Sequence, residues 1–199
     1  MTRLFLAAAG LAVLGAPALA APHPYELDRS HSSIVASWSN SGINRPFMAF
    51  PEFDGEFILD MEEPQNSRIT VELAAASLWT GVAALDSNLK SEWYFDVAQF
   101  PTARFEATGF ERIDPDHGVM RGDLTIKGRT HPVEFRVALN HYGRHPLAPF
   151  RDNLDDLVVA GFSASAVISR SAFDLGLVRT IPDEIEIRIE IAFEREGEL

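Results

Sequence analysis

The chain has 199 residues, 29 of them acidic and 17 basic, which gives a formal net charge of −12 at pH 7. This charge argues against nucleic acid or an anionic membrane surface as a partner, because both require a basic patch. The absence of cysteine excludes thiol catalysis and disulfide bonds, so stability has to come from an ordinary hydrophobic core.

The first twenty residues predict a cleaved secretory signal. Arg3 supplies a short positive segment, residues 4–14 form an apolar run, and Ala18-Leu19-Ala20 has the small-x-small form of a cleavage site. The run is too short to span a bilayer, although an uncleaved anchor is the alternative. We therefore expect cleavage after Ala20, a periplasmic location, and a single mature domain over residues 21–199 with no further membrane-spanning segment.

Alternation of apolar and polar residues dominates the mature part. A period of two places the apolar side chains on one face of a β-strand. In chain order the pattern occupies residues 33–39, 53–59, 68–73, 104–110, 119–126, 133–139, 162–168 and 185–193. Gly55 is expected to mark a bend or bulge in the second segment, and Gly128 to supply a turn.

Two segments interrupt this pattern. Residues 86–94 are the one stretch that looks helical, with Asp86 as its cap and with Leu89 and Trp93 four apart on one side. Residues 140–157 are longer than a hairpin needs and predict a loop over one end of the sheet.

About eight antiparallel strands with one apolar face each can form a sandwich or a barrel. We favour an all-β, antiparallel eight-stranded β-barrel with one short helix, because closure removes exposed strand edges. The interior of such a barrel is filled by its own side chains or holds one small ligand. The alanines at 36, 74–76, 164 and 166 favour a ligand, because small side chains leave room.

Several local strings, in their order and spacing, resemble the YceI-like family from about Tyr25 to Glu194. The most specific are the Phe-Asp-Val-Ala-Gln-Phe-Pro string at 95–101 and the Gly-Asp-Leu-Thr-Ile-Lys-Gly string at 122–128. Shorter matches lie at 28–32, 54–57, 80–81 and 169–173.

The resemblance implies an exported, lipocalin-like barrel whose apolar tunnel binds a polyisoprenoid lipid or an isoprenoid quinone. We expect no cofactor and no metal. Combined with the strand phase, the resemblance predicts that the tunnel is lined by Ile34, Trp38, Phe53, Phe57, Ile69, Val71, Leu78, Leu89, Trp93, Phe95, Phe105, Leu124, Phe135, Phe162, Ala164, Ile187 and Ile189.

Polar side chains near the mouth are expected to hold a head group: His31, Asn40, Asn88 and Arg170. Asn40 and Asn88 stand where the family often carries histidine, so a role that needs those imidazoles is in doubt here. Leu89 and Trp93 are expected to close one end of the tunnel, and the 140–157 loop to gate the other.

Two other functions stay open. An enzyme acting on a lipophilic substrate would use Asp28, His31 or Asp123 as acid or base, although neighbouring strand residues point to opposite faces and rarely form such a pair. A structural or stress-response module would have a solid core and no ligand. Histidines and aspartates between residues 141 and 156 match no tight metal-ligand spacing. A homodimer through an exposed strand is possible, and we expect any membrane contact to be transient.

Overall fold

The barrel is built from ten strand segments in the computed structural model, which describes residues 21–176 and 182–198. They are β1 (His23–Leu27), β2 (Ser33–Ser37), β3 (Phe47–Ala49), β4 (Phe53–Leu59), β5 (Arg68–Ala74), β6 (Thr102–Arg112), β7 (His117–Ile126), β8 (Arg129–Arg144), β9 (Leu157–Ser169) and β10 (Glu184–Glu196). The predicted signal at residues 1–20 lies outside the described residues.

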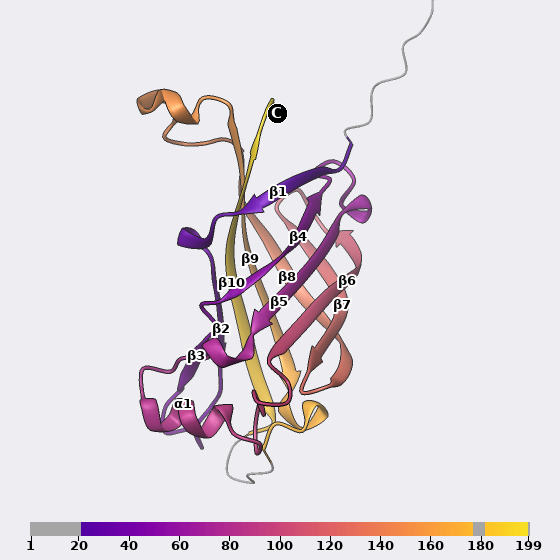
Figure 1. The fold of residues 1–199 in the computed structure, drawn as a ribbon. Helices are drawn as coiled ribbons and strands as arrows, with labels where there is room; N and C mark the ends of the chain where they lie inside the picture. The colour runs from indigo at the N-terminus through magenta and orange to yellow at the C-terminus, as the bar shows by residue number, and fades with distance from the viewer. Residues whose placement is uncertain (1–20, 177–181, 199) are drawn as a thin grey trace, which may run out of the picture.

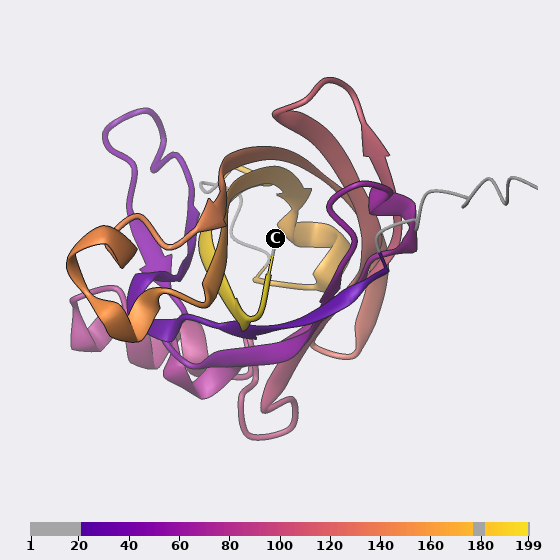
Figure 2. The same cartoon turned by 90° about the horizontal axis from the view of Figure 1, so that it is seen from above.

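Within the described chain these ten segments act as eight strands, because two strands are interrupted. A 3₁₀ turn (Arg29–His31) separates β1 from β2, and both segments pair with β10. Residues 50–52 separate β3 from β4, which pair with β2 and β1 respectively. The pairing of β1 with β10 closes the sheet into the predicted antiparallel barrel (Figures 1 and 2).

The alternating sequence pattern sets which face of each strand points inward. In β10, Ile185, Ile187 and Ile189 lie opposite apolar residues of β9, while the intervening charged residues lie on the outer face. The β7–β8 hairpin turns at Lys127 and Gly128, whose φ angles of 50° and 70° match the tight turns that glycine favours. Gly128 therefore supplies the turn that the sequence predicts.

Gly55 does not mark a bulge, contrary to the expectation, since the pairing of β4 with β5 runs through it without a shift of register. A Cβ at this position would collide with the backbone carbonyl of Thr70. The glycine is required by close approach of the neighbouring strand.

The sequence pattern does not predict β1 or β3: β3 has only three residues, and in β1 Tyr25 is the one fully buried side chain. The predicted helix is shifted: α1 runs over Ala83–Lys90 and begins after Val82. Asp86 is inside its first turn and does not cap it. Its carboxylate accepts hydrogen bonds from the Thr80 backbone N–H at 2.7 Å and from Thr80 Oγ1 at 2.6 Å.

The two ends of the barrel are closed to different extents. At the end that carries α1, a 3₁₀ helix (Arg170–Phe173) crosses below the strands, and the fully buried ring of Phe173 packs edge-on against His131. At the opposite end β8 runs on to Arg144, so the predicted loop shrinks to residues 145–156, which project beside the barrel (Figure 1). Among the described residues no helix is long and apolar enough to cross a bilayer.

Candidate ligand-binding site

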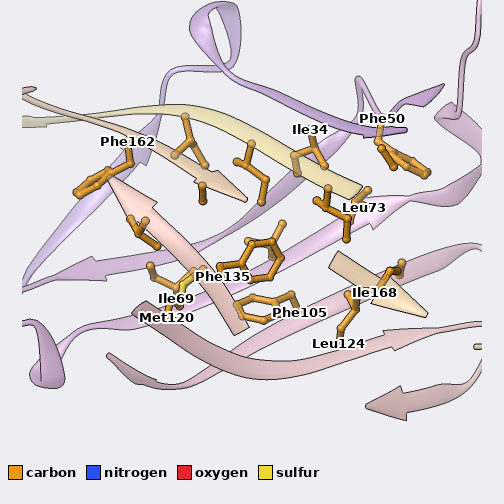
Figure 3. A pocket seen from close by; sticks show the side chains of 18 of the residues that line it. Ile34, Phe50, Ile69, Leu73, Phe105, Met120, Leu124, Phe135, Phe162 and Ile168 are labelled. Atoms are coloured by element: carbon orange, nitrogen blue, oxygen red, sulfur yellow. The ribbon is translucent and has the colours of Figure 1, made fainter. Parts of the chain in front are cut away.

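The barrel contains a cavity of about 510 Å³. Every strand segment except β1 contributes to its wall, and so does α1. The wall includes Phe105 and Phe135, whose rings lie edge to face at 5.3 Å between centroids. Figure 3 shows these rings and Met120 among apolar side chains that converge on the space from different strands.

The space is not filled by the protein's own side chains. Ile69 and Val71 of β5, and Ile187 and Ile189 of β10, point inward but are only half-buried. In a solid core, inward-facing side chains of central strands would be fully buried. Their residual exposure is to the cavity, which excludes the solid-core alternative.

Most residues predicted from the sequence to line a tunnel surround this cavity. Fourteen of the seventeen do so: Ile34, Trp38, Phe57, Ile69, Val71, Leu89, Phe95, Phe105, Leu124, Phe135, Phe162, Ala164, Ile187 and Ile189. Strand phase was the signal, because the inward face of a closed barrel is the cavity wall.

Three predicted lining residues lie elsewhere. Phe53 and Leu78 are buried in the packed core beside the cavity. Trp93 is 72% exposed and lies outside the cavity wall. The i,i+4 relation of Leu89 and Trp93 does not hold, because α1 ends at Lys90 and the chain then turns, with the Ser91 N–H donating to the Asn88 carbonyl. Of the predicted pair, Leu89 lines this end of the cavity and Trp93 does not.

Three of the four predicted head-group residues lie together at the α1 end of the cavity. Asn40 follows β2, Asn88 is on α1, and Arg170 begins the 3₁₀ helix below the strands. Arg170 is buried, with Nη1 donating to the Leu175 carbonyl at 2.9 Å. Asn40 Nδ2 donates to Asn44 Oδ1 at 2.9 Å. Polar groups thus lie next to the apolar middle part of the wall.

His31 is not at the mouth, contrary to the expectation. It lies on the exposed turn between β1 and β2, where Nδ1 is 2.6 Å from Asp28 Oδ2. Desolvation tends to raise the pKa of Asp28, but hydrogen bonds from Ser30 and His31 outweigh it and bring the pKa below its usual value. Ser32 accepts from the Ala192 N–H, away from the imidazole. Ser30 Oγ is 3.2 Å from the same Nδ1 and donates to Asp28 Oδ1 at 2.6 Å, so the three side chains contact one another on the exposed turn, outside the cavity wall. These contacts stabilise the interruption of the strand.

The opposite end of the cavity is polar, and sequence reasoning missed it. It is lined by the turns that follow β4 and β6: Asp60, Met61, Pro64, Ser67, Glu111, Arg112, Asp114, Pro115, Asp116 and His117. Arg112 joins the two turns, because its Nη2 donates to the Met61 carbonyl at 2.5 Å. The only signal was the turn-forming Pro64 and Pro115 at strand ends. The 145–156 loop contributes no lining residue and does not gate the cavity.

Asp60 organises this end. Its buried carboxylate accepts hydrogen bonds from the backbone N–H groups of Glu62 and Glu63 at 3.1 and 2.8 Å and from Asn66 Nδ2 at 3.0 Å. Burial alone would raise the pKa of Asp60, but these donors outweigh it and hold the pKa below its ordinary value. Across the described chain no group of three or more His, Asp or Glu side chains could hold a metal ion.

Comparisons with known proteins match this architecture. A UPF0312 protein of Pseudomonas putida strain W619 is 32% identical over 171 residues, 84% of each chain. The crystal structure of BcnA from Burkholderia cenocepacia superposes with a TM-score of 0.72 at 20% identity, covering 84% of this chain and 99% of that one. A polyisoprenoid-binding domain from Saccharophagus degradans has a TM-score of 0.59 at 10% identity, covering 85% and 97%.

The family model described as the YceI-like domain matches residues 25–193, which include every strand segment of the barrel except the ends of β1 and β10. The chain therefore belongs to the YceI-like family.

Proposed function

We propose that this protein is a non-enzymatic carrier that holds one polyisoprenoid chain, such as the tail of an isoprenoid quinone, inside its barrel. The observation that carries the proposal is the cavity of about 510 Å³, walled by apolar side chains from nine of the ten strand segments that the structure describes. A polyisoprenoid-binding domain with the same fold supports it.

The energetics favour a long apolar ligand. Each methylene moved from water into an apolar wall contributes about 0.8 kcal/mol, so about ten such groups contribute ~8 kcal/mol before association costs are subtracted. We place the carrier in the periplasm, on the basis of the signal-like first twenty residues. A prenyl chain is insoluble there, and a barrel with an apolar cavity is a suitable carrier.

The head group would lie at the α1 end, beside Asn40, Asn88 and Arg170. Amide and guanidinium groups can donate hydrogen bonds to carbonyl or hydroxyl oxygens. A quinone or prenyl alcohol presents such oxygens at one end of an apolar tail, which fits an apolar middle wall with hydrogen-bond donors at the α1 end.

The residues of the enzymatic alternative do not face this cavity. His31 and Asp28 lie on an exposed turn, and Asp123 is exposed on the outer face of β7, between the inward-facing Gly122 and Leu124. A general acid or base has to come within hydrogen-bond reach of its substrate. This placement favours binding over catalysis.

A thermal melt tests the proposal. A prenyl quinone added to the lipid-free protein should raise the unfolding midpoint in a concentration-dependent way, because the ligand prefers the folded state. A soluble quinone without a prenyl tail is the control and should leave the midpoint unchanged. No shift with any prenyl compound would refute the proposal. An enzyme would instead lose a turnover on His31→Ala while keeping ligand affinity.

A further inference from the structure

An exposed apolar patch lies beside the α1 end of the cavity. Its members are Ile43, at the β2–β3 turn, Phe47 on β3, Trp79, and Val82, which precedes α1; they are between 43% and 80% exposed. Phe47 and Trp79 contact each other edge to face at 6.2 Å. Ala49 and Trp79 also pair through their backbones, which joins the two segments into one surface.

The segments that build the patch carry almost no charge. Residues 39–50 and 73–85 contain no aspartate or glutamate and one basic residue, Arg45, in a chain that has 29 acidic residues. Arg45 is paired with Glu186 at 2.6 Å, and the nearest carboxylate in the sequence, Asp86, accepts hydrogen bonds from Thr80, so the patch carries little net charge. The rest of this acidic protein would be repelled by anionic phospholipid, whereas this face would be repelled much less.

The patch is continuous with the cavity wall. Asn40 and Pro46 line the cavity on the same turn that exposes Ile43, and Leu85 lines it on the same helix that begins after Val82. Figure 1 shows β3 and α1 together at this end of the barrel. One surface therefore carries both the exposed apolar side chains and the end of the lipid cavity.

We propose that this patch docks the protein on a phospholipid bilayer, with the α1 end of the cavity toward the membrane. The inference rests on the proposed carrier function, since a prenyl chain then passes between bilayer and cavity without crossing water. Tryptophan and phenylalanine suit the interface between head groups and acyl chains. Because the patch is neutral, docking on phosphatidylcholine should be apolar in origin and insensitive to salt.

The test is flotation with phosphatidylcholine vesicles, comparing the wild-type chain with the double variant Ile43→Asp/Val82→Asp. Aspartate is a favoured residue before a helix, so the change at 82 should not weaken α1. The control is Phe150→Asp, because Phe150 is 82% exposed on the 145–156 loop at the opposite end of the barrel. We expect the double variant to partition about tenfold or more weakly and the control to float like wild type.

Three results would overturn the docking proposal: wild-type protein that stays in solution with these vesicles, equal loss of flotation in the Phe150 variant, or flotation that salt abolishes. A dimer that the double variant splits, without vesicle binding, would assign the patch to self-association. Prenyl-quinone binding in vesicle-free solution should be equal in all three proteins. If none of the three proteins binds the prenyl quinone, the carrier function is refuted. The flotation result would then still test the docking proposal separately.

Discussion

Filling the cavity should separate ligand binding from folding. Ala164 of β9 lines the cavity, and its cross-strand neighbours Val137 and Ile189 line it too. Ala164→Phe directs a benzyl group into the void from the middle of the wall. We therefore expect the variant to fold and to bind a prenyl ligand more weakly.

The size of the effect follows from the area that the ring takes from the ligand. If about three ligand carbons lose their contact at ~0.8 kcal/mol each, binding weakens by ~2.4 kcal/mol, or about 50-fold in Kd. The ring itself gains burial of about 1.5–3 kcal/mol, so the free energy of unfolding of the ligand-free protein should not fall.

The assay is titration with a prenyl quinone, together with urea unfolding of the ligand-free protein. Val167→Phe is the matched control, since Val167 is exposed on the outer face of the same strand and a ring there leaves the cavity unchanged. Unchanged affinity in the Ala164 variant, with its fold intact, would refute the assignment of this cavity as the binding site. So would an equal loss in the Val167 control.

Three further changes test other parts of the structure. Asp60→Asn should lower the free energy of unfolding at pH 7 by ~1–3 kcal/mol, because backbone donors lose part of their acceptor. Because folding lowers the pKa of Asp60, wild-type protein should lose this stabilisation as pH falls below about 4, and urea unfolding of the variant should show a flatter acid dependence. Trp93→Ala should leave prenyl-quinone affinity unchanged, because Trp93 lies outside the cavity wall; weaker binding in titration would contradict that placement. Gly122→Ala should destabilise by ~1–3 kcal/mol in urea, since a Cβ there would collide with Phe105 and the Glu106 carbonyl; a neutral result would mean that the strands can separate at this point.

The sequence predicted the barrel because each long strand is apolar on one face only. The same alternation predicted that Ile187 and Ile189 line the cavity, because a side chain that points into a hollow barrel faces its cavity. The alternation could not distinguish Phe53 from the residues that line the cavity. Its side chain also points inward, but it lies where the barrel interior is filled by packed side chains. Whether an inward-facing residue lines the cavity or lies in the packed core depends on how the side chains of the whole folded chain fill the barrel.

The alternation of apolar and polar residues does not predict the contacts that turn residues make. Met61, in the turn after β4, and Arg112, at the end of β6, are 51 residues apart in the sequence, and they meet because β4, β5 and β6 are neighbours in the sheet. Trp93 was placed on α1 from its spacing to Leu89, but the helix had already ended at Lys90. His31 stabilises an interruption between β1 and β2 that no periodicity reveals, because only the pairing with β10 shows the two segments as one strand.

Native mass spectrometry of the protein purified without added lipid tests the central claim most directly. We predict one bound molecule per chain, releasable by organic solvent, in a series of masses spaced by isoprene units. Ala164→Phe should carry markedly less of it than Val167→Phe. Wild-type protein that is free of lipid in its native preparation, and that takes up no prenyl chain when one is offered, would contradict the account.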